Sequence, residues 1–251
     1  MYDEDDRTRS TSFAAALVGV PLLGHAVPAL AGSRPAGLPG SPAPIWPALR
    51  RALDVQDRTS SRQGYALTFD DGPHAQGTPA TLEILAHEKV SATFFLVGEQ
   101  VRRNPALARE IVAAGHRVAL HCDRHRNLLR LAPRQVHEDI AAARATIEDA
   151  TSSVVELYRP PYGVLTAAAL REARAHGWRT LLWTHWGRDW AARATSESIT
   201  RLVTDGVAPG AVLLLHDADD YSAPGSWRRM AAALPRVLDT LAARGLSPAA
   251  P

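Results

Sequence analysis

Cysteine and lysine are almost absent from this chain of 251 residues, which has one of each, Cys122 and Lys89. A single cysteine excludes an intrachain disulfide and a cysteine-rich zinc module. The other 27 basic residues are arginines, and they are scattered among 26 acidic residues, so the net charge is only +2. Because the basic residues form no run or stripe, the sequence predicts no nucleic-acid partner.

The first 62 residues differ in composition from the rest of the chain. No charged residue occurs between Thr11 and Gly32, and residues 13–23 have the length of the apolar core of a signal peptide. The Ala29-Leu30-Ala31 sequence that follows fits a small-residue cleavage site, whereas the four acidic residues at positions 3–6 are atypical of a leader. Export, membrane anchoring and an unstructured arm therefore stay open on this pattern.

We expect three segments along the chain. Residues 1–31 are predicted to be a signal peptide or a membrane anchor, which would place the protein outside the cell or in the cell envelope. Residues 32–62 are predicted to be a linker, because residues 33–47 are rich in proline, glycine and alanine. Residues 63–251 are long enough for one sizeable domain, which we expect to be monomeric.

Short apolar runs alternate with helical patterns from Tyr65 onward. Six runs have the length and composition of buried strands, namely Tyr65–Phe69, Ala92–Val97, Arg117–Leu120, Val155–Tyr158, Thr180–Trp183 and Val212–Leu215. Helix starts are indicated at Thr78-Pro79, Asn104-Pro105 and Thr166. The alternation predicts a parallel sheet or barrel with both faces covered, and because six strands are few for a barrel, a doubly wound sheet also fits.

Ionisable residues follow five of these six strands, and in both architectures an active site lies at the carboxyl ends of the strands. Asp70 and Asp71 follow the first strand. Two adjacent carboxylates in a partly buried place need a cation or cationic side chains to compensate them, although a solvent-exposed Asp-Asp-Gly turn would also explain them. His121 and His125 follow the third strand, and with one carboxylate they would supply the two nitrogens and one oxygen of a catalytic zinc site.

The later strand ends carry Arg159, Asp189 and His216. Arg159 enters a rigid Pro-Pro-Tyr-Gly turn, where it could either face an anionic base or lie on the surface. Asp189 is followed by Trp190, and a tryptophan beside a polar cleft could stack on a sugar ring or enclose a small apolar group. His216 ends an apolar strand and is a candidate general acid, although a buried structural histidine is the alternative.

Five motifs in this chain resemble, in order, those of the polysaccharide deacetylases (carbohydrate esterase family 4, the NodB-homology domain). They are Thr68-Phe69-Asp70-Asp71-Gly72, His121-x-x-x-His125, Arg159-Pro160-Pro161-Tyr162-Gly163, Asp189-Trp190 and Leu214-x-His216-Asp217. The resemblance spans about Tyr65 to Gly245 and implies an α/β fold, an irregular (β/α) barrel of about seven strands. It also implies a bound divalent metal ion, usually zinc and sometimes cobalt.

The resemblance further implies a role for each of these residues. Asp71, His121 and His125 would bind the metal. Asp70 would be the general base, oriented by Arg159, and His216 would be the general acid, with its pKa adjusted by Asp189. The backbone N–H of Tyr162 would hold the oxyanion, and Trp190 and Leu214 would enclose the acetyl methyl group.

The implied activity is a hydrolase reaction in which residues 63–251, as the catalytic domain, remove N-acetyl groups from an N-acetylglucosamine polysaccharide. Peptidoglycan and chitin-type oligomers are the expected substrates. An O-deacetylase of acetylated xylan, a hydrolase of a small non-sugar amide and an inactive glycan-binding envelope module are the alternatives. The presence of Asp70, Arg159 and His216 argues against an inactive module.

Two departures from the family pattern lead to further expectations. Cys122 stands where Ser or Thr is usual, and we hypothesise that its thiol is a neutral neighbour of the metal site and not a ligand. The C-terminal residues 245–251 are short and broken by proline, so the barrel is predicted to be incompletely closed near the C-terminus.

Overall fold

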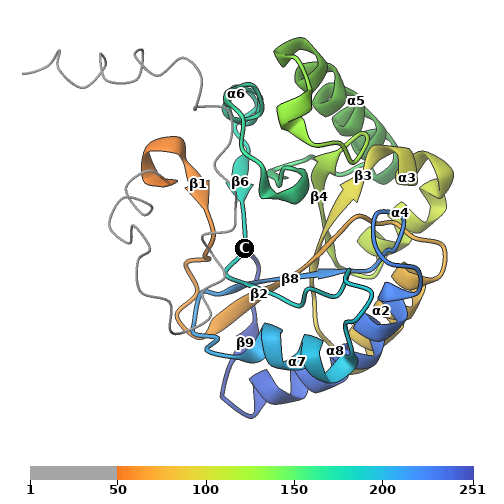
Figure 1. Cartoon of the computed structure of the whole chain (residues 1–251), viewed down its shortest axis with the longest axis vertical. Coiled ribbons are helices and arrows are strands. Elements are labelled where there is room, and N and C mark those ends of the chain that lie inside the picture. The colour runs from red at the N-terminus through yellow and green to blue at the C-terminus, as the bar shows by residue number, and fades with distance from the viewer. Residues whose placement is uncertain (1–49) are drawn as a thin grey trace, which may run out of the picture.

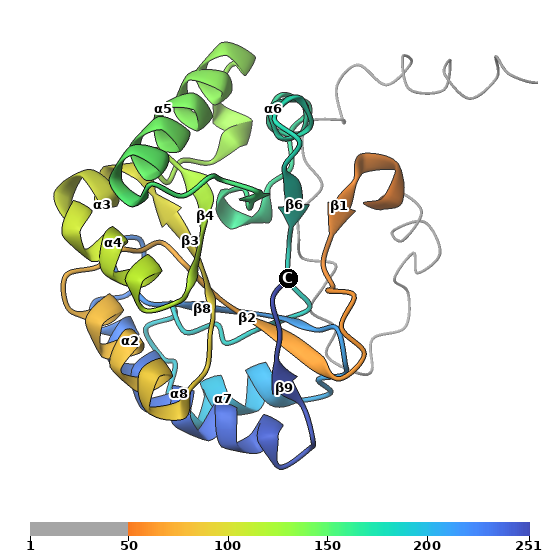
Figure 2. The same cartoon turned by 180° about the vertical axis from the view of Figure 1, so that it is seen from behind.

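One curled sheet forms the centre of the part of the chain that the structure, a computed structural model, describes, which is residues 50–251 (Figures 1 and 2). Along the sheet the strands follow the order β1-β6-β5-β4-β3-β2-β8-β7, and every pairing among them is parallel. Their bounds, in chain order, are β1 Val55–Gln56, β2 Gly64–Asp70, β3 Thr93–Val97, β4 Arg117–Cys122, β5 Leu157–Tyr158, β6 Arg179–Leu181, β7 His185–Trp186 and β8 Val212–His216. A ninth strand, β9 (Ser247–Pro248), pairs with the start of β2.

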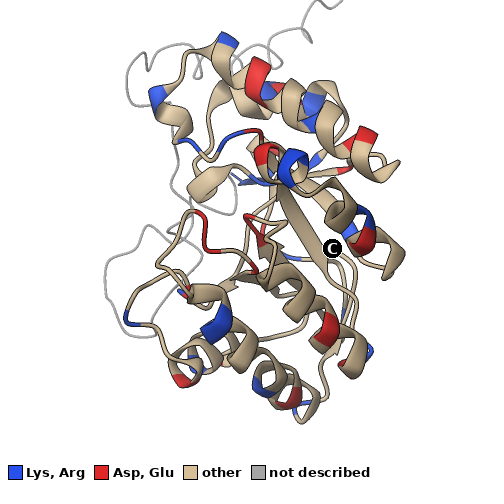
Figure 3. Ribbon diagram, turned by 90° about the vertical axis from the view of Figure 1, so that its right-hand side faces the viewer, with Lys and Arg blue, Asp and Glu red and all other residues tan. Residues whose placement is uncertain are grey.

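Helices connect the strands and lie around the outside of the sheet, as both views show. They are α2 Gly77–Glu88, α3 Gly98–Arg103, α4 Pro105–Ala113, α5 Pro133–Thr151, α6 Ala167–Ala175, α7 Ser196–Thr204 and α8 Ser226–Ala242, with short 3₁₀ turns η3 Leu128–Arg130 and η4 Pro161–Gly163. Figure 3 shows basic and acidic segments interspersed along the helices that face the viewer. No helix among residues 50–251 has the length and apolar character needed to cross a membrane.

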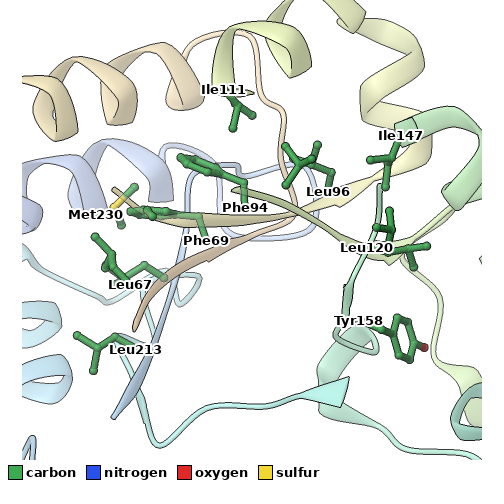
Figure 4. Close-up of a cluster of buried hydrophobic side chains, with 14 of the residues drawn as sticks. Leu67, Phe69, Phe94, Leu96, Ile111, Leu120, Ile147, Tyr158, Leu213 and Met230 are labelled. Carbon is green, nitrogen blue, oxygen red and sulfur yellow. The ribbon is translucent and has the colours of Figure 1, made fainter. Parts of the chain in front are cut away.

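Side-chain alternation along the strands separates two apolar clusters. Leu67 and Phe69 of β2 point outward and pack against the helices with Phe94 of β3 and Leu213 of β8, in the larger cluster shown in Figure 4. The intervening residues point to the inside of the curl, where a second cluster contains Ala66, Phe95 and Leu214, among others. Successive side chains of a strand point to opposite faces. Asp70 lies four residues after Ala66 on β2, so its side chain also points to the inside of the curl.

The curled sheet confirms the predicted barrel and excludes the doubly wound sheet. The barrel is open, as predicted, but the opening lies between the edge strands β1 and β7 of the described sheet. The C-terminal residues were expected to leave the gap, yet they form β9, which pairs with the start of β2, and Ala249 N–H donates to Tyr65 C=O at 2.8 Å. Pro248 has no backbone N–H to donate, but the other edge of this two-residue strand can still pair with β2.

Two other expectations need correction. Residues 32–62 were predicted to be a linker, but β1 lies within this range and pairs with β6, so the sheet begins before residue 63. The predicted signal peptide or anchor at residues 1–31 and the rest of the linker up to residue 49 lie outside the described residues.

Thr78 was predicted to cap α2, but Gln76 is the N-cap and the Thr78 hydroxyl donates to Asp217. Thr166 caps α6 as predicted, accepting from Ala169 N–H at 3.2 Å.

Replacing Leu96 with alanine tests the outer cluster. Leu96 is fully buried on β3, so Leu96→Ala removes buried apolar surface and leaves a cavity. We expect the free energy of unfolding, measured by urea denaturation, to fall by about 2–5 kcal/mol. Val154→Ala is the control because Val154 is 77% exposed, and it should change stability by less than about 0.5 kcal/mol. Equal losses in the two variants would contradict this placement of the core.

Candidate active site

A cleft of about 360 Å³ lies at the carboxyl ends of the strands, inside the curl of the sheet. Eight of the ten predicted site residues line it, namely Asp70, Asp71, His121, His125, Tyr162, Trp190, Leu214 and His216. The other two, Arg159 and Asp189, are buried behind the wall of the cleft and hydrogen-bond to residues that line it. The fold therefore brings all ten together, from strand ends up to about 145 residues apart in sequence.

Parallel register explains part of this convergence. Asp70 at the end of β2 is directly opposite His216 at the end of β8, and Thr68 is opposite Leu214. Residues that lie opposite each other on neighbouring strands point to the same face of the sheet. Leu214 and His216 therefore point into the cleft, as Asp70 does. On β4 the same alternation directs His121 inward and Cys122 outward.

Asp71, His121 and His125 form the one cluster among residues 50–251 in which three metal-ligand side chains converge. Their ligand atoms all lie within 4.8 Å of one another, and Cys122 does not belong to the cluster. Asp71 Oδ1 lies 3.5 Å from His121 Nε2 and 3.3 Å from His125 Nε2. Asp71 has a φ of 79°, a strained backbone conformation for a residue with a side chain, which persists only when its surroundings hold it in place.

The chemistry of these three groups fits a divalent cation. Burial lowers the pKa of both histidines to about 3, so their imidazoles are neutral at physiological pH. His121 Nδ1 donates to the backbone oxygen of Arg159 at 2.7 Å, and this tautomer leaves a lone pair on Nε2 that faces Asp71. Asp71 Oδ1 is buried and accepts no hydrogen bond from the described residues. A cation would stabilise facing lone pairs in a buried place, and two nitrogens with one carboxylate are a zinc-type donor set.

Arg159 holds Asp70 in place. Its guanidinium is fully buried, and Nη1 donates to Asp70 Oδ1 at 2.6 Å and to Thr68 Oγ1 at 2.9 Å. Nε and Nη2 donate to the backbone oxygens of Leu181 and Leu182. A buried ion pair is stable only when its remaining donors are also satisfied, and here backbone carbonyls at the end of β6 satisfy them.

His216 is held and charged by Asp189. Asp189 Oδ1 lies 3.0 Å from His216 Nδ1, and Asp189 Oδ2 accepts from the backbone N–H of His216 at 2.7 Å. Burial opposes the charged imidazolium, but the carboxylates of Asp189, Asp71 and Asp70 outweigh it and raise the pKa of His216 to about 10. With Nδ1 occupied by Asp189, the proton on Nε2 is the one available to the cleft.

Aromatic side chains form the apolar part of the cleft. Trp183, Trp186 and Trp190 line it in sequence, with ring centroids 5.9 Å and 4.9 Å apart, and Trp190 meets His216 edge-on at 5.4 Å. Tyr162 also lines it from η4, with a φ of 58°. Its neighbour Gly163 has a φ of 66°, so two successive residues of this turn have left-handed backbone conformations.

Two residues near the site were missed by the sequence analysis, Asp139 and Tyr221. Asp139 is a buried residue of α5, and its carboxylate accepts from the backbone N–H groups of Asp123 and Arg124 and from Arg126 Nη2 at 2.6 Å. It thereby fixes the loop between His121 and His125. Tyr221 lies in the loop after β8 and packs on His125. Neither carries a sequence signal, because a mid-helix acid and a loop tyrosine are ordinary surface residues until the tertiary contacts are known.

The fold and the donor set together define a parallel (β/α) barrel with a candidate divalent-metal site of the kind that hydrolases use. A family model described as polysaccharide deacetylase matches residues 57–181, and the relatives described next extend that match, so the chain belongs to the polysaccharide deacetylase family. The matched range ends before His216, which lines the same cleft, and before Asp189, which hydrogen-bonds to His216.

Curated relatives extend over most of the chain. A chitooligosaccharide deacetylase from Bradyrhizobium sp. is 37% identical over 175 residues, which cover 69% of this chain and 78% of that protein. A peptidoglycan-N-acetylglucosamine deacetylase from Bacillus cereus is 33% identical over 183 residues, which cover 72% of this chain and 82% of that protein. Among solved structures, a family 4 carbohydrate esterase from Streptomyces lividans in complex with acetate aligns with a TM-score of 0.67 and 31% identity, covering 76% of this chain and 94% of that one.

Substitution of Asp139 tests whether it fixes the histidine loop. Asp139→Asn removes the charge that faces Arg126 and replaces one acceptor oxygen with an amide donor, so buried N–H groups lose their partner. We expect a loss of about 1–3 kcal/mol in the free energy of unfolding, measured by urea denaturation. Asp149→Asn, on the exposed side of the same helix, is the matched control and should change stability by less than about 0.5 kcal/mol. An unchanged midpoint for Asp139→Asn would show that the loop does not depend on this carboxylate.

Proposed function

We propose that this protein removes acetyl groups from the N-acetylglucosamine units of a glycan, such as peptidoglycan or a chitin-type oligomer, and releases acetate. The observation that supports this most directly is that three groups border one cleft: the Asp70–Arg159 pair, the His216–Asp189 pair and the candidate metal ligands. Hydrolysis of an amide needs a base, an acid and a stabilised oxyanion, and this cleft offers all three. The names of the relatives from Bradyrhizobium and Bacillus support the glycan as the substrate class.

Asp71, His121 and His125 would hold the cation, for which we propose zinc, with cobalt as the alternative that suits the same donors. When bound, the ion would polarise the acetamide carbonyl and lower the pKa of its water. Cys122 would stay outside the ligand set, because burial raises the pKa of its thiol well above the ordinary value and its strand parity directs it away.

The side chains around the cation divide the proton transfers between them. Asp70, oriented by Arg159, would take the proton from the attacking water. The backbone N–H of Tyr162 would donate to the substrate oxygen as negative charge develops there. His216 would then donate from Nε2 to the departing nitrogen, because an amide nitrogen leaves poorly without a proton. Trp190 and Leu214 would enclose the acetyl methyl group.

We also propose that the protein acts outside the cytoplasm, in the cell envelope or as a secreted protein, because its expected substrates lie there and residues 11–32 are mostly apolar and contain no Asp, Glu, Lys or Arg. Fractionation of cells that express the full chain tests this point. Finding the chain in the cytosolic fraction alone would contradict it.

Two variants separate turnover from metal binding. Asp70→Asn should lower acetate release from acetylated chitooligosaccharides or peptidoglycan by about 10²–10⁴-fold, since the base is lost, while bound zinc measured by elemental analysis stays unchanged. His125→Ala should lose both zinc and activity, because a nitrogen ligand is removed. Acetate release from acetylxylan, whose acetyl groups are esters, is measured in the same assay to test the O-deacetylase alternative. Near-normal rates with Asp70→Asn would refute the base assignment, and no release from any substrate after zinc is restored to the chelated protein would refute the proposed activity.

A comparison of two substrates with different leaving groups tests the role of His216. His216→Asn should lower release of acetate from the amide substrate by about 10²–10⁴-fold. Hydrolysis of an aryl acetate should fall much less, because a phenolate leaves without being protonated. The ratio of the two losses is the measurement, and it cancels any general disturbance of the cleft. Equal losses on both substrates would show that His216 is not the acid for the leaving nitrogen.

A further inference from the structure

The two histidines of the candidate metal site are held in different ways. His121 Nδ1 donates to the backbone oxygen of Arg159, so a hydrogen bond fixes the rotation of its ring. His125 Nδ1 is buried and has no hydrogen-bond partner among residues 50–251. A metal-binding histidine is normally oriented by a hydrogen bond from its other nitrogen, so His125 needs another means of orientation.

Two tyrosine rings contact the imidazole of His125. Tyr221 stacks on it with a centroid distance of 4.6 Å and an interplanar angle of 18°. Tyr162 meets it edge-on at 4.5 Å and 69°. Stacked and edge-to-face pairs at these distances are favourable and restrict ring rotation. Tyr162 is 57% exposed, whereas Tyr221 is partly buried and is the better-fixed of the two.

Tyr221 is anchored by hydrogen bonds to α3. Its hydroxyl donates to Glu99 Oε1 at 2.5 Å and accepts from Gln100 Nε2 at 3.1 Å, and both residues belong to α3. The preceding residue, Asp220, lies 3.6 Å from Arg103 Nη1, also on α3. The loop after β8 is thereby tied to α3, and the tie directs the face of the Tyr221 ring onto His125.

We propose that Tyr221 is a positioning residue that orients His125 by ring stacking, in place of the hydrogen bond that orients His121. The inference rests on the proposed metal site. Its physical basis is that a ring that cannot rotate loses less freedom when Nε2 binds a cation, so the affinity of the site rises. The hydroxyl contacts of Tyr221 place the ring, and the ring acts on His125.

The test measures the zinc affinity of the full chain by competition with a chromophoric chelator, and the visible spectrum of the cobalt-loaded protein. Tyr221→Leu and Tyr221→Met remove the stacked ring, and each should weaken zinc binding about tenfold, within the range known for residues that orient metal ligands. Each should also alter the cobalt bands. Tyr221→Phe keeps the ring and should stay within about threefold of the wild type.

Asp220→Asn is the matched control, since it lies in the same loop, weakens the contact with Arg103 and does not touch His125. It should leave zinc affinity unchanged. The inference is overturned if either folded ring-less variant, checked by circular dichroism, binds zinc and gives cobalt bands like the wild type. It is also overturned if Asp220→Asn loses as much affinity as Tyr221→Leu. Failure of the wild type to bind zinc at all would instead refute the proposed function.

Discussion

The geometry of the cleft depends on the hydrogen bonds that the buried guanidinium of Arg159 makes. Its side chain pairs with Asp70, and its own backbone oxygen accepts from His121 Nδ1, so one residue orients both the candidate base and a candidate ligand. The guanidinium also joins β2 to the end of β6 through Thr68, Leu181 and Leu182. A charge with no exposure is tolerated only because nearly every donor is used, and this requirement fixes the position of each partner.

Several carboxylates share this small interior, and each is stabilised by a different partner. Asp70 has Arg159 and Asp189 has His216, whereas Asp71 Oδ1 faces two neutral imidazoles and has no hydrogen-bond donor among residues 50–251. Burial therefore raises the pKa of Asp71 to about 7, with His216 opposing the shift and the other carboxylates adding to it. A cation beside Asp71 would balance this charge, which is why the donor set supports the proposed function.

Much of the fold followed from patterns along the chain. All six predicted strands exist, and no strand end differs from the expected one by more than two residues. The prediction succeeds because short apolar runs indicate buried strands directly. The two-residue strands β1, β7 and β9 were missed, since so short a segment has no periodicity of its own and forms only because a neighbouring strand offers a free edge. Thr78 looked like a helix cap and instead hydrogen-bonds Asp217, a contact between residues 139 apart.

The sequence by itself determined which residues gather at the cleft, because chemistry-bearing side chains at the carboxyl ends of parallel strands must meet at one edge of the sheet. Strand patterns alone could not determine how they are divided into pairs, which the resemblance to the deacetylases implied and the structure shows. Asp70 and Asp71 are adjacent and chemically identical, and only the handedness of the backbone at Asp71 and the reach of Arg159 give them different neighbours. The contacts of Asp139 and Tyr221 were likewise decided by tertiary structure, since each depends on helix and loop packing that no local pattern records.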